Sequence, residues 1–414
     1  MPPTTPKNIV ILGGSYGGLS TAHHLLKHTL PHLAEPHQVV LVSASSETMC
    51  RPACPRALIS DDMFPQDKLF VGTAAMFAQY PGDSFRFVQG SATKLDHEKR
   101  EVVVKLQDGR SEVIGFEALV IATGASTPSP LLGLNATSDE LRASWRAFRE
   151  VLPAARSIVV AGGGPTGVET AGELGEYLNG RAGYFSRRLE DPKVAITLVT
   201  GGKQLLPALR PSIAAQAEEY LAQVGVVVVK NARVERVVPE GAGVDDVGAS
   251  AVVELDSGDV FRADLYIPTT GTRPNTGFVD ASLLTGDGRV ETNPTTLRVD
   301  KAGPRIYAIG DASSYARAAV YNILTAVPVL GGNIKRDLLG GSADGGNGNA
   351  EGEDRVFKED MRETQMVPIG KSKGVGAAMG YWLPSFLVWL IKGRDYWLWT
   401  TGRLWSGKQW VKES

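Results

Sequence analysis

The sequence predicts an α/β fold in which two similar strand–turn–helix units are followed by a smaller C-terminal segment. The first observation is an apolar strand pattern at residues 8–12, which runs into a glycine-rich turn at residues 13–18 and then into a helical stretch. The second is the recurrence of this arrangement, with a strand at residues 157–161 and a turn at residues 162–167. The third is a length of 414 residues with 43% hydrophobic content, which is sufficient for two or three domains with their own cores.

Both turns follow the G-x-G-x-x-G spacing of a dinucleotide-binding fingerprint. The fingerprint positions hold Gly13, Ser15 and Gly18 in the first copy, and Gly162, Gly164 and Gly167 in the second. The first glycine allows the tight turn, the second lets the backbone approach a pyrophosphate, and the third lets the helix pack on the strand. Ser15 departs from this pattern, but its side chain is small enough to be compatible with binding. The repeat predicts two Rossmann-like dinucleotide-binding domains.

The strand that follows each turn should end in an acidic residue that binds a ribose. The first such strand ends in Ser43 and the second in Thr200, so neither carries the expected acid. Without a carboxylate in the second unit a 2′-phosphate is not repelled, and Lys203 follows closely as a candidate partner for it. The sequence is therefore compatible with either NADH or NADPH.

Three later motifs fit an FAD-binding domain that is interrupted by an NAD(P)H-binding domain. A strand at residues 119–122 ends in Thr123 and Gly124, where the chain leaves the first unit, and residues 270–275 stand where it returns. Asp311 ends a further strand, and its carboxylate can accept hydrogen bonds from the ribityl hydroxyls of a flavin. We expect an FAD-binding domain at 1–125 and 285–340, an NAD(P)H-binding domain at 126–284, a flexible linker at 341–355 and an aromatic-rich C-terminal segment at 356–414.

The order of these motifs resembles that of the pyridine-nucleotide-dependent flavoprotein superfamily, over nearly the whole chain. Within the superfamily, residues 367–380 and 392–395 are similar to the apoptosis-inducing-factor-like group, which includes ferroptosis suppressor protein. The pair Pro55 and Arg56 is similar to fungal members of that group. The resemblance implies FAD and either NADH or NADPH as cofactors.

The resemblance also implies roles for the residues that match its motifs. The residues implied for FAD are Gly13, Ser15, Gly18, Arg56, Thr123, Gly124 and Asp311. Those implied for NAD(P)H are Gly162, Gly164 and Gly167, with Glu169 as a catalytic residue near the nicotinamide. Two alternatives stay open, because Asp311 could cap the helix that follows it and Glu169 could be a first-turn acid that the helix dipole favours.

Several other functions are not expected. Cys50 and Cys54 have three residues between them, whereas redox-active pairs of this superfamily have two or four, and nearby prolines disfavour a regular helix. Five of the six histidines fall between residues 23 and 37, but no cysteine or dense carboxylate set stands beside them as further metal ligands. The net charge of −2 disfavours nucleic-acid binding. The lack of a secretory signal, a lipidation motif and a run of about 20 apolar residues predicts a cytoplasmic location.

The C-terminal segment is rich in tryptophan, since six of the seven tryptophans lie beyond residue 380, beside Lys392 and Arg394. Tryptophan near cations is typical of the headgroup zone of a bilayer, and an apolar run as short as residues 381–391 lies on a membrane rather than crossing it. Tryptophan is also enriched in protein interfaces. Peripheral contact with an intracellular membrane, a cover over the flavin site and a homodimer interface therefore all stay open.

These patterns predict an FAD-dependent NAD(P)H oxidoreductase that passes a hydride through the flavin to a quinone-like or other aromatic acceptor. Residues 316–329 lack the glutamine that type II NADH dehydrogenases carry there, which weakens the case for a quinone. Two other functions are compatible with the sequence. One is a flavin-dependent tailoring oxidoreductase of a specialised-metabolite pathway, and the other is a non-enzymatic effector of the apoptosis-inducing-factor type.

Overall fold

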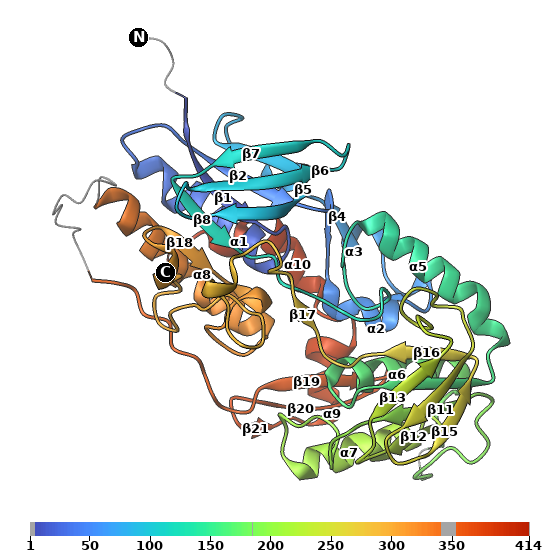
Figure 1. The fold of residues 1–414 in the computed structure, drawn as a ribbon. Helices are drawn as coiled ribbons and strands as arrows, with labels where there is room; N and C mark the ends of the chain where they lie inside the picture. The colour runs from blue at the N-terminus through green and yellow to red at the C-terminus, as the bar shows by residue number, and fades with distance from the viewer. Residues whose placement is uncertain (1–4, 184, 341–352, 414) are drawn as a thin grey trace.

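The first unit is built on a seven-stranded sheet with the order β18-β8-β1-β2-β5-β6-β7. The computed structural model describes residues 5–183, 185–340 and 353–413, and Figure 1 shows this sheet at one end of the molecule. Its strands are β1 (Lys7–Leu12), β2 (His37–Ser43), β5 (Phe85–Asp96), β6 (Glu101–Leu106), β7 (Ser111–Gly115), β8 (Ala118–Ile121) and β18 (Ile306–Ala308). The part from β18 to β5 is parallel, and β5, β6 and β7 continue it as antiparallel hairpins.

The central strands β1 and β2 each contain a run of four buried apolar residues, because both faces of the sheet are covered there. In β1, Ile9 and Ile11 face a core shared with α1 (Tyr16–His28) and α8 (Val320–Leu339), whereas Val10 faces the opposite core. All three side chains are fully buried. A continuous apolar run is therefore the expected sequence of this strand, and α1 and α8 pack against each other on the same side.

The second unit repeats the arrangement with a four-stranded parallel sheet in the order β12-β11-β10-β16. Its strands are β10 (Ser157–Ala161), β11 (Ala195–Val199), β12 (Val226–Val229) and β16 (Leu265–Pro268). An antiparallel sheet packs beside it, made of β13 (Val234–Val238), β14 (Ala251–Leu255) and β15 (Val260–Ala263). The helices of this unit are α5 (Ser138–Val151), α6 (Pro165–Asn179) and α7 (Pro211–Ala222). The predicted α/β fold with two Rossmann-like units is confirmed.

The two chain crossings between the units lie side by side. In the antiparallel pair β9 (Ala125–Ser126) and β17 (Arg273–Pro274), the outgoing crossing is hydrogen-bonded to the returning one. Asn275 extends this contact, because its Nδ2 donates to the Thr123 carbonyl at 3.0 Å and Thr123 Oγ1 donates to the Asn275 carbonyl at 2.7 Å. The motif at which the chain leaves the first unit is thus hydrogen-bonded to the motif at which it returns.

Short elements between β2 and β5 form a region that we call the connecting region. They are β3 (Glu47–Met49), β4 (Phe70–Gly72), α2 (Cys54–Ala57), α3 (Gln66–Leu69) and α4 (Thr73–Phe77). Helix α2 lies against α6, so the connecting region contacts the second unit directly.

The C-terminal segment contacts both units (Figure 1). It consists of β19 (Gln365–Ile369), β20 (Lys373–Ala378), β21 (Tyr381–Trp382), α9 (Ser385–Val388), the π-helix η8 (Trp389–Gly393), α10 (Leu398–Trp405) and the 3-10 helix η9 (Lys408–Trp410). Strand β19 packs on α6 and β20 on α7, whereas α10 and η9 return to α1. The segment is therefore integrated into the fold rather than appended to it.

Basic side chains of α1 hold the end of this segment. His23 Nε2 lies 2.8 Å from the Trp405 carbonyl oxygen, and His28 Nε2 lies 2.9 Å from that of Trp410. Lys27 Nζ donates to the Gly407 carbonyl at 2.5 Å. The histidine-rich stretch thus anchors the C-terminal segment. Within the described ranges, no group of three or more His, Cys, Asp or Glu residues is arranged to hold a metal ion.

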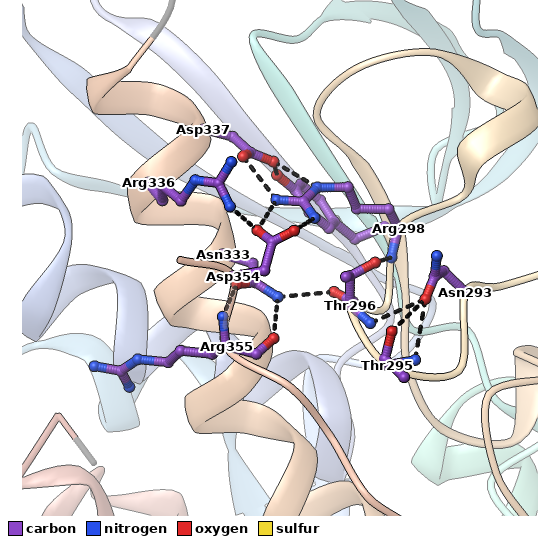
Figure 2. Close-up of polar contacts among 10 residues, drawn as sticks. Asn293, Thr295, Thr296, Arg298, Asn333, Arg336, Asp337, Asp354 and Arg355 are labelled. Atoms are coloured by element: carbon purple, nitrogen blue, oxygen red, sulfur yellow. Dashed lines mark hydrogen bonds and ion pairs between the residues drawn. The ribbon is translucent and has the colours of Figure 1, made fainter. Parts of the chain in front are cut away.

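Asp354 and Arg355, at the start of the described range 353–413, belong to a charged cluster (Figure 2). Arg298 is paired with Asp337 at 2.7 Å and with Asp354 at 2.9 Å, and Arg336 is also paired with Asp354. The Asn333 side chain forms hydrogen bonds with both backbone groups of Arg355. These contacts attach the start of the C-terminal segment to α8.

Most of the predicted linker, residues 341–352, lies outside the described residues. Among the helices that the structure describes, none combines the length and apolar character needed to span a bilayer.

Candidate active site

A cavity of about 680 Å³ connects the two glycine-rich turns. Gly13 and Ser15 line it from the first unit, and Gly164 and Glu169 line it from the second. Parallel sheets place their ligands at the carboxyl ends of the strands, which is where both turns begin. Of the other residues predicted from the sequence, Thr123, Gly124 and Asp311 also line the cavity.

The two turns have the same backbone geometry at their first glycine. Gly13 has φ 116° and Gly162 has φ 128°, a region that side-chain-bearing residues rarely adopt. A Cβ on Gly13 would stand 2.2 Å from the Ala122 carbonyl oxygen, and one on Gly162 would stand 2.4 Å from Thr269 Oγ1. Each glycine is required because its turn passes the end of the neighbouring strand in close contact.

The third glycine of each turn lets the helix approach the turn. A Cβ on Gly18 would stand 1.8 Å from the Gly13 carbonyl oxygen, and one on Gly167 would stand 1.9 Å from that of Gly162. Neither Gly18 nor Gly167 lines the cavity, and neither does Gly162. These three residues shape the site from behind.

The middle position of each turn faces the cavity. A Cβ on Gly164 would have no atom within 4 Å, so the space beside this residue is open to a ligand. Ser15 has φ −124°, an extended conformation that any residue adopts, and its side chain makes no capping bond to α1. The departure at Ser15 is thus tolerated by the backbone and leaves a hydroxyl free for a ligand. Both turns fit a pyrophosphate at the start of a helix.

Asp311 lies just beyond β18, as predicted. It belongs to the 3-10 helix η7 (Gly310–Ala312), whereas α8 begins only at Val320 with Ala319 at its N-cap. The alternative role of Asp311 as the cap of the following helix is therefore wrong. Arg51 Nη1 lies 3.7 Å from the Asp311 carboxylate and also lines the cavity. This leaves a partly exposed carboxylate that faces the predicted FAD side.

Glu169 is paired with Lys392 of the C-terminal segment. Lys392 Nζ lies 2.5 Å from Glu169 Oε1 and donates to the Met366 carbonyl at 3.0 Å. Burial raises the pKa of the Glu169 carboxyl to about 7, although the nearby Lys392 ammonium acts to lower it. Because Lys392 comes from η8, the C-terminal segment supplies a cation to the cavity wall. No spacing pattern in the sequence links the two residues.

Trp397 also reaches the cavity from the C-terminal segment. Its φ is 69° and that of Tyr396 is 51°, so two consecutive bulky residues adopt the left-handed conformation. Such residues cost about 1–3 kcal/mol each and persist only where their surroundings hold them. Lys392 Nζ lies 4.8 Å from the centre of the Trp397 ring, a cation–π contact that fixes the ring beside the ion pair.

Arg56 does not line the cavity. It forms a buried ion pair with Glu173 at 2.8 Å, and its guanidinium lies 4.8 Å from the centre of the Tyr396 ring. Tyr396 completes this group by donating from its hydroxyl to Glu173 at 2.9 Å. The structure therefore places Arg56 in a contact between the connecting region, α6 and the C-terminal segment rather than beside the predicted cofactor sites.

The two cysteines are free and fully buried, and neither lines the cavity. Burial raises the pKa of the Cys50 thiol to about 11 and that of Cys54 to about 12. Cys50 Sγ accepts from the Tyr16 hydroxyl and donates to the Tyr396 carbonyl. Protonated thiols that are occupied in packing are poor nucleophiles.

Comparisons with known proteins agree with this geometry. Residues 7–327 match the family model described as pyridine nucleotide-disulphide oxidoreductase. The chain is 61% identical to oxidoreductase phnG of Penicillium herquei, over 99% of both chains, and 26% identical to ferroptosis suppressor protein 1 of Homo sapiens, over 94% of this chain and 93% of the relative. The structure of a sulfide:quinone oxidoreductase from Aquifex aeolicus shares the fold with a TM-score of 0.69 and 15% identity, over 97% of this chain and 92% of the other.

The family implies FAD and NAD(P)H as the cofactors of an oxidoreductase, and the repeated turns around one cavity fit that pair. The chain belongs to the pyridine nucleotide-disulphide oxidoreductase family and is one of its apoptosis-inducing-factor-like members.

Proposed function

We propose that this protein transfers a hydride from NAD(P)H through FAD to a quinone-like or other aromatic small molecule. The single observation that carries the proposal is the cavity shared by both glycine turns. FAD would bind at the first turn, where Ser15, Thr123 and Asp311 face the cavity, and the nicotinamide nucleotide at the second, beside Gly164. When bound, FAD supplies the two-electron chemistry.

The ion pair of Glu169 and Lys392 is suited to hold a proton beside the reacting groups. Reduction of a quinone to a hydroquinone takes up two electrons and two protons, of which a hydride brings both electrons and one proton. The second proton must come from the protein or from solvent. Lys392 carries protons on a buried ammonium at the cavity wall, and burial places the pKa of the Glu169 carboxyl near 7. A group with a pKa near the working pH is effective in proton transfer.

Trp397 supports a planar acceptor. Its indole ring lines the cavity and contacts the Lys392 ammonium, and its backbone is in the left-handed conformation. Aromatic rings stack on other aromatic rings in offset or edge-on arrangements, and such pairs gain about 0.5–1.5 kcal/mol beyond the buried area. A wall of fixed shape also suits the narrower form of the proposal, in which one metabolite of a specialised pathway is the only acceptor.

The C-terminal segment also presents an apolar surface to solvent, which we call the aromatic surface. Its exposed side chains are Met379, Tyr381, Trp382, Phe386, Trp389, Leu390 and Trp399. We propose that this surface contacts the headgroup zone of a membrane, because the exposed Arg394 lies next to its aromatic side chains and donates from its backbone N–H to the Trp389 carbonyl at 2.7 Å. In a liposome flotation assay the protein should float, and a variant with Phe386 and Trp399 changed to serine should not. Failure of the wild-type protein to float, together with dimers in sedimentation, would instead assign the surface to self-association.

The proposed activity is tested by anaerobic stopped-flow absorbance of the FAD-loaded protein. Addition of NADH or NADPH should bleach the flavin band, and a simple quinone should restore it within the turnover time. Bleaching by either nucleotide without reoxidation by any quinone would point to a dedicated acceptor. Failure of both nucleotides to bleach the flavin would overturn the proposal, and a tight reduced complex that no acceptor reoxidises would favour a non-enzymatic effector.

A further inference from the structure

The turn that follows β11 is held in a defined shape beside the second glycine turn. Thr200 N–H donates to the Val229 carbonyl at 2.8 Å, and the Thr200 carbonyl accepts from Ala232 N–H at 3.2 Å. The Gly202 carbonyl accepts from Asn231 N–H at 3.1 Å. Residues 200–202 are thus attached along their length to the loop that follows β12.

The segment that starts at Thr200 contacts the second glycine turn twice, at Thr200 and again at Leu206. A Cβ on Gly163 would stand 2.4 Å from Thr200 Oγ1, and the Gly163 carbonyl accepts from Leu206 N–H at 2.8 Å. Residues 200–206 therefore form a short loop that starts and ends on the fingerprint. In a Rossmann-type unit, the end of the second strand is where the adenosine ribose lies.

This loop carries positive charge and no acid. Residues 200–210 contain no Asp or Glu, and Lys203 is exposed in the loop. Arg233 lies across it, because a Cβ on Gly201 would stand 2.6 Å from Arg233 Cγ and 2.8 Å from its Nε. Neither Lys203 nor Arg233 forms an ion pair within the part of the chain that the structure describes. The nearby Asp256 carboxylate accepts from the backbone N–H of Arg233 at 2.8 Å instead.

We propose that the second unit prefers NADPH and that Arg233 and Lys203 bind its 2′-phosphate. An acid at Thr200 would bind a ribose with a free 2′-hydroxyl and would repel a phosphate, and no acid stands there. A guanidinium binds phosphate with two parallel hydrogen bonds, and a lysine adds a point charge. Gly201 has a function of its own in this arrangement, since any side chain there would displace the arginine. The inference rests on the proposed function, because it assumes that the second turn binds a nicotinamide nucleotide.

Calorimetric titration of the FAD-loaded protein with NADP⁺ and NAD⁺ tests the preference directly, without turnover. The wild-type protein should bind NADP⁺ about tenfold or more tightly than NAD⁺. Arg233→Ala and Lys203→Ala should each weaken NADP⁺ binding by about tenfold and leave the affinity for NAD⁺ within about twofold, because only the phosphate loses a partner. Arg233→Lys should restore part of the affinity.

Lys230→Ala is the matched control, because Lys230 is also an exposed cation near the end of β12 but is already paired with Glu218 at 3.0 Å. It should change neither affinity. Adenosine 2′,5′-bisphosphate should compete with NADP⁺ in the wild-type protein and lose this ability in Arg233→Ala. Equal binding of NAD⁺ and NADP⁺, unchanged in Arg233→Ala, would refute the inference and leave the proposed function standing. Absence of binding of both nucleotides would count against the proposed function itself.

Discussion

Substitution of the middle glycine of the second turn separates nucleotide binding from folding. Gly164 has φ −77°, which alanine adopts freely, and a Cβ there would meet no atom within 4 Å. Gly164→Ala should therefore fold with a stability within about 1 kcal/mol of the wild type, since the loss as a helix N-cap and the gain in chain stiffness are both small. The new methyl group would occupy the space in which a pyrophosphate approaches the backbone.

The expected loss of nucleotide affinity follows from the hydrogen bonds that the new methyl group displaces. A hydrogen bond from a backbone N–H to a charged group contributes about 1.5–3 kcal/mol, so loss of one such contact weakens binding by about 10- to 150-fold. Calorimetry should show this loss for NADP⁺ and NAD⁺ alike, with the affinity for FAD unchanged because Ser15, not Gly164, faces the first site. Chemical denaturation gives the stability on the same samples.

Gly167→Ala is the contrasting variant, because its Cβ would stand 1.9 Å from the Gly162 carbonyl oxygen. Helix α6 must then move, and overpacking of this kind costs about 1–3 kcal/mol or more, so stability should fall together with binding. Gly402→Ala, in an open position on α10, is a neutral control. If Gly164→Ala bound both nucleotides as tightly as the wild type, or lost FAD instead, the assignment of the second turn to NAD(P)H would be refuted.

Three further predictions concern the ion pair, the cysteines and pH. Lys392→Met removes the cation beside the buried Glu169 carboxylate, so the pKa of Glu169 should rise further. Flavin reoxidation by a quinone should then slow by about 10²-fold or more, whereas Lys392→Arg should retain part of the rate. Equal rates of Lys392→Met and the wild type at all pH values would contradict a role of Lys392 in proton transfer. Cys54→Ser should leave the rate of flavin reduction within twofold of the wild type, because the buried Cys54 thiol does not line the cavity. A loss of activity would instead indicate thiol chemistry. Burial lowers the pKa of His23 and His24 from 6.5 to about 4, so their contribution to stability is complete above pH 6.5 and is lost as the pH falls toward 4. Denaturation curves should show a decline of about 3 kcal/mol for each histidine over that range, and flat stability would contradict it.

The turns could be predicted from the sequence because their glycines are fixed by local geometry. Gly13 and Gly162 need a positive φ, and Gly18 and Gly167 need a close contact with a residue only five positions away. Such requirements leave a regular spacing in the sequence. The strands before the turns were equally readable, since burial on both faces demands an unbroken apolar run.

The far wall of the cavity could not be predicted in the same way. Lys392 meets Glu169 across 223 positions, and a contact of that kind leaves no spacing pattern. Arg56 was expected to bind FAD because Pro55 and Arg56 are similar to a pair in related proteins. That similarity did not indicate that the partner of Arg56 is Glu173. The contacts of the α1 histidines with residues 405–413 likewise join positions far apart in the sequence, so no local pattern predicts them.

The anchoring of residues 405–413 on α1 has a consequence for how the protein is made. Ribosomes deliver the chain from its N-terminus, and early domains usually begin to fold while later ones are still being synthesised. Here Trp405 packs on Tyr16 at the start of α1, with ring centres 4.9 Å apart, and Tyr16 lines the cavity. Nearly four hundred residues must therefore emerge before the first helix acquires all its neighbours. Nascent chains stalled before residue 400 should remain sensitive to protease around α1, and flavin loading should be an event that follows release.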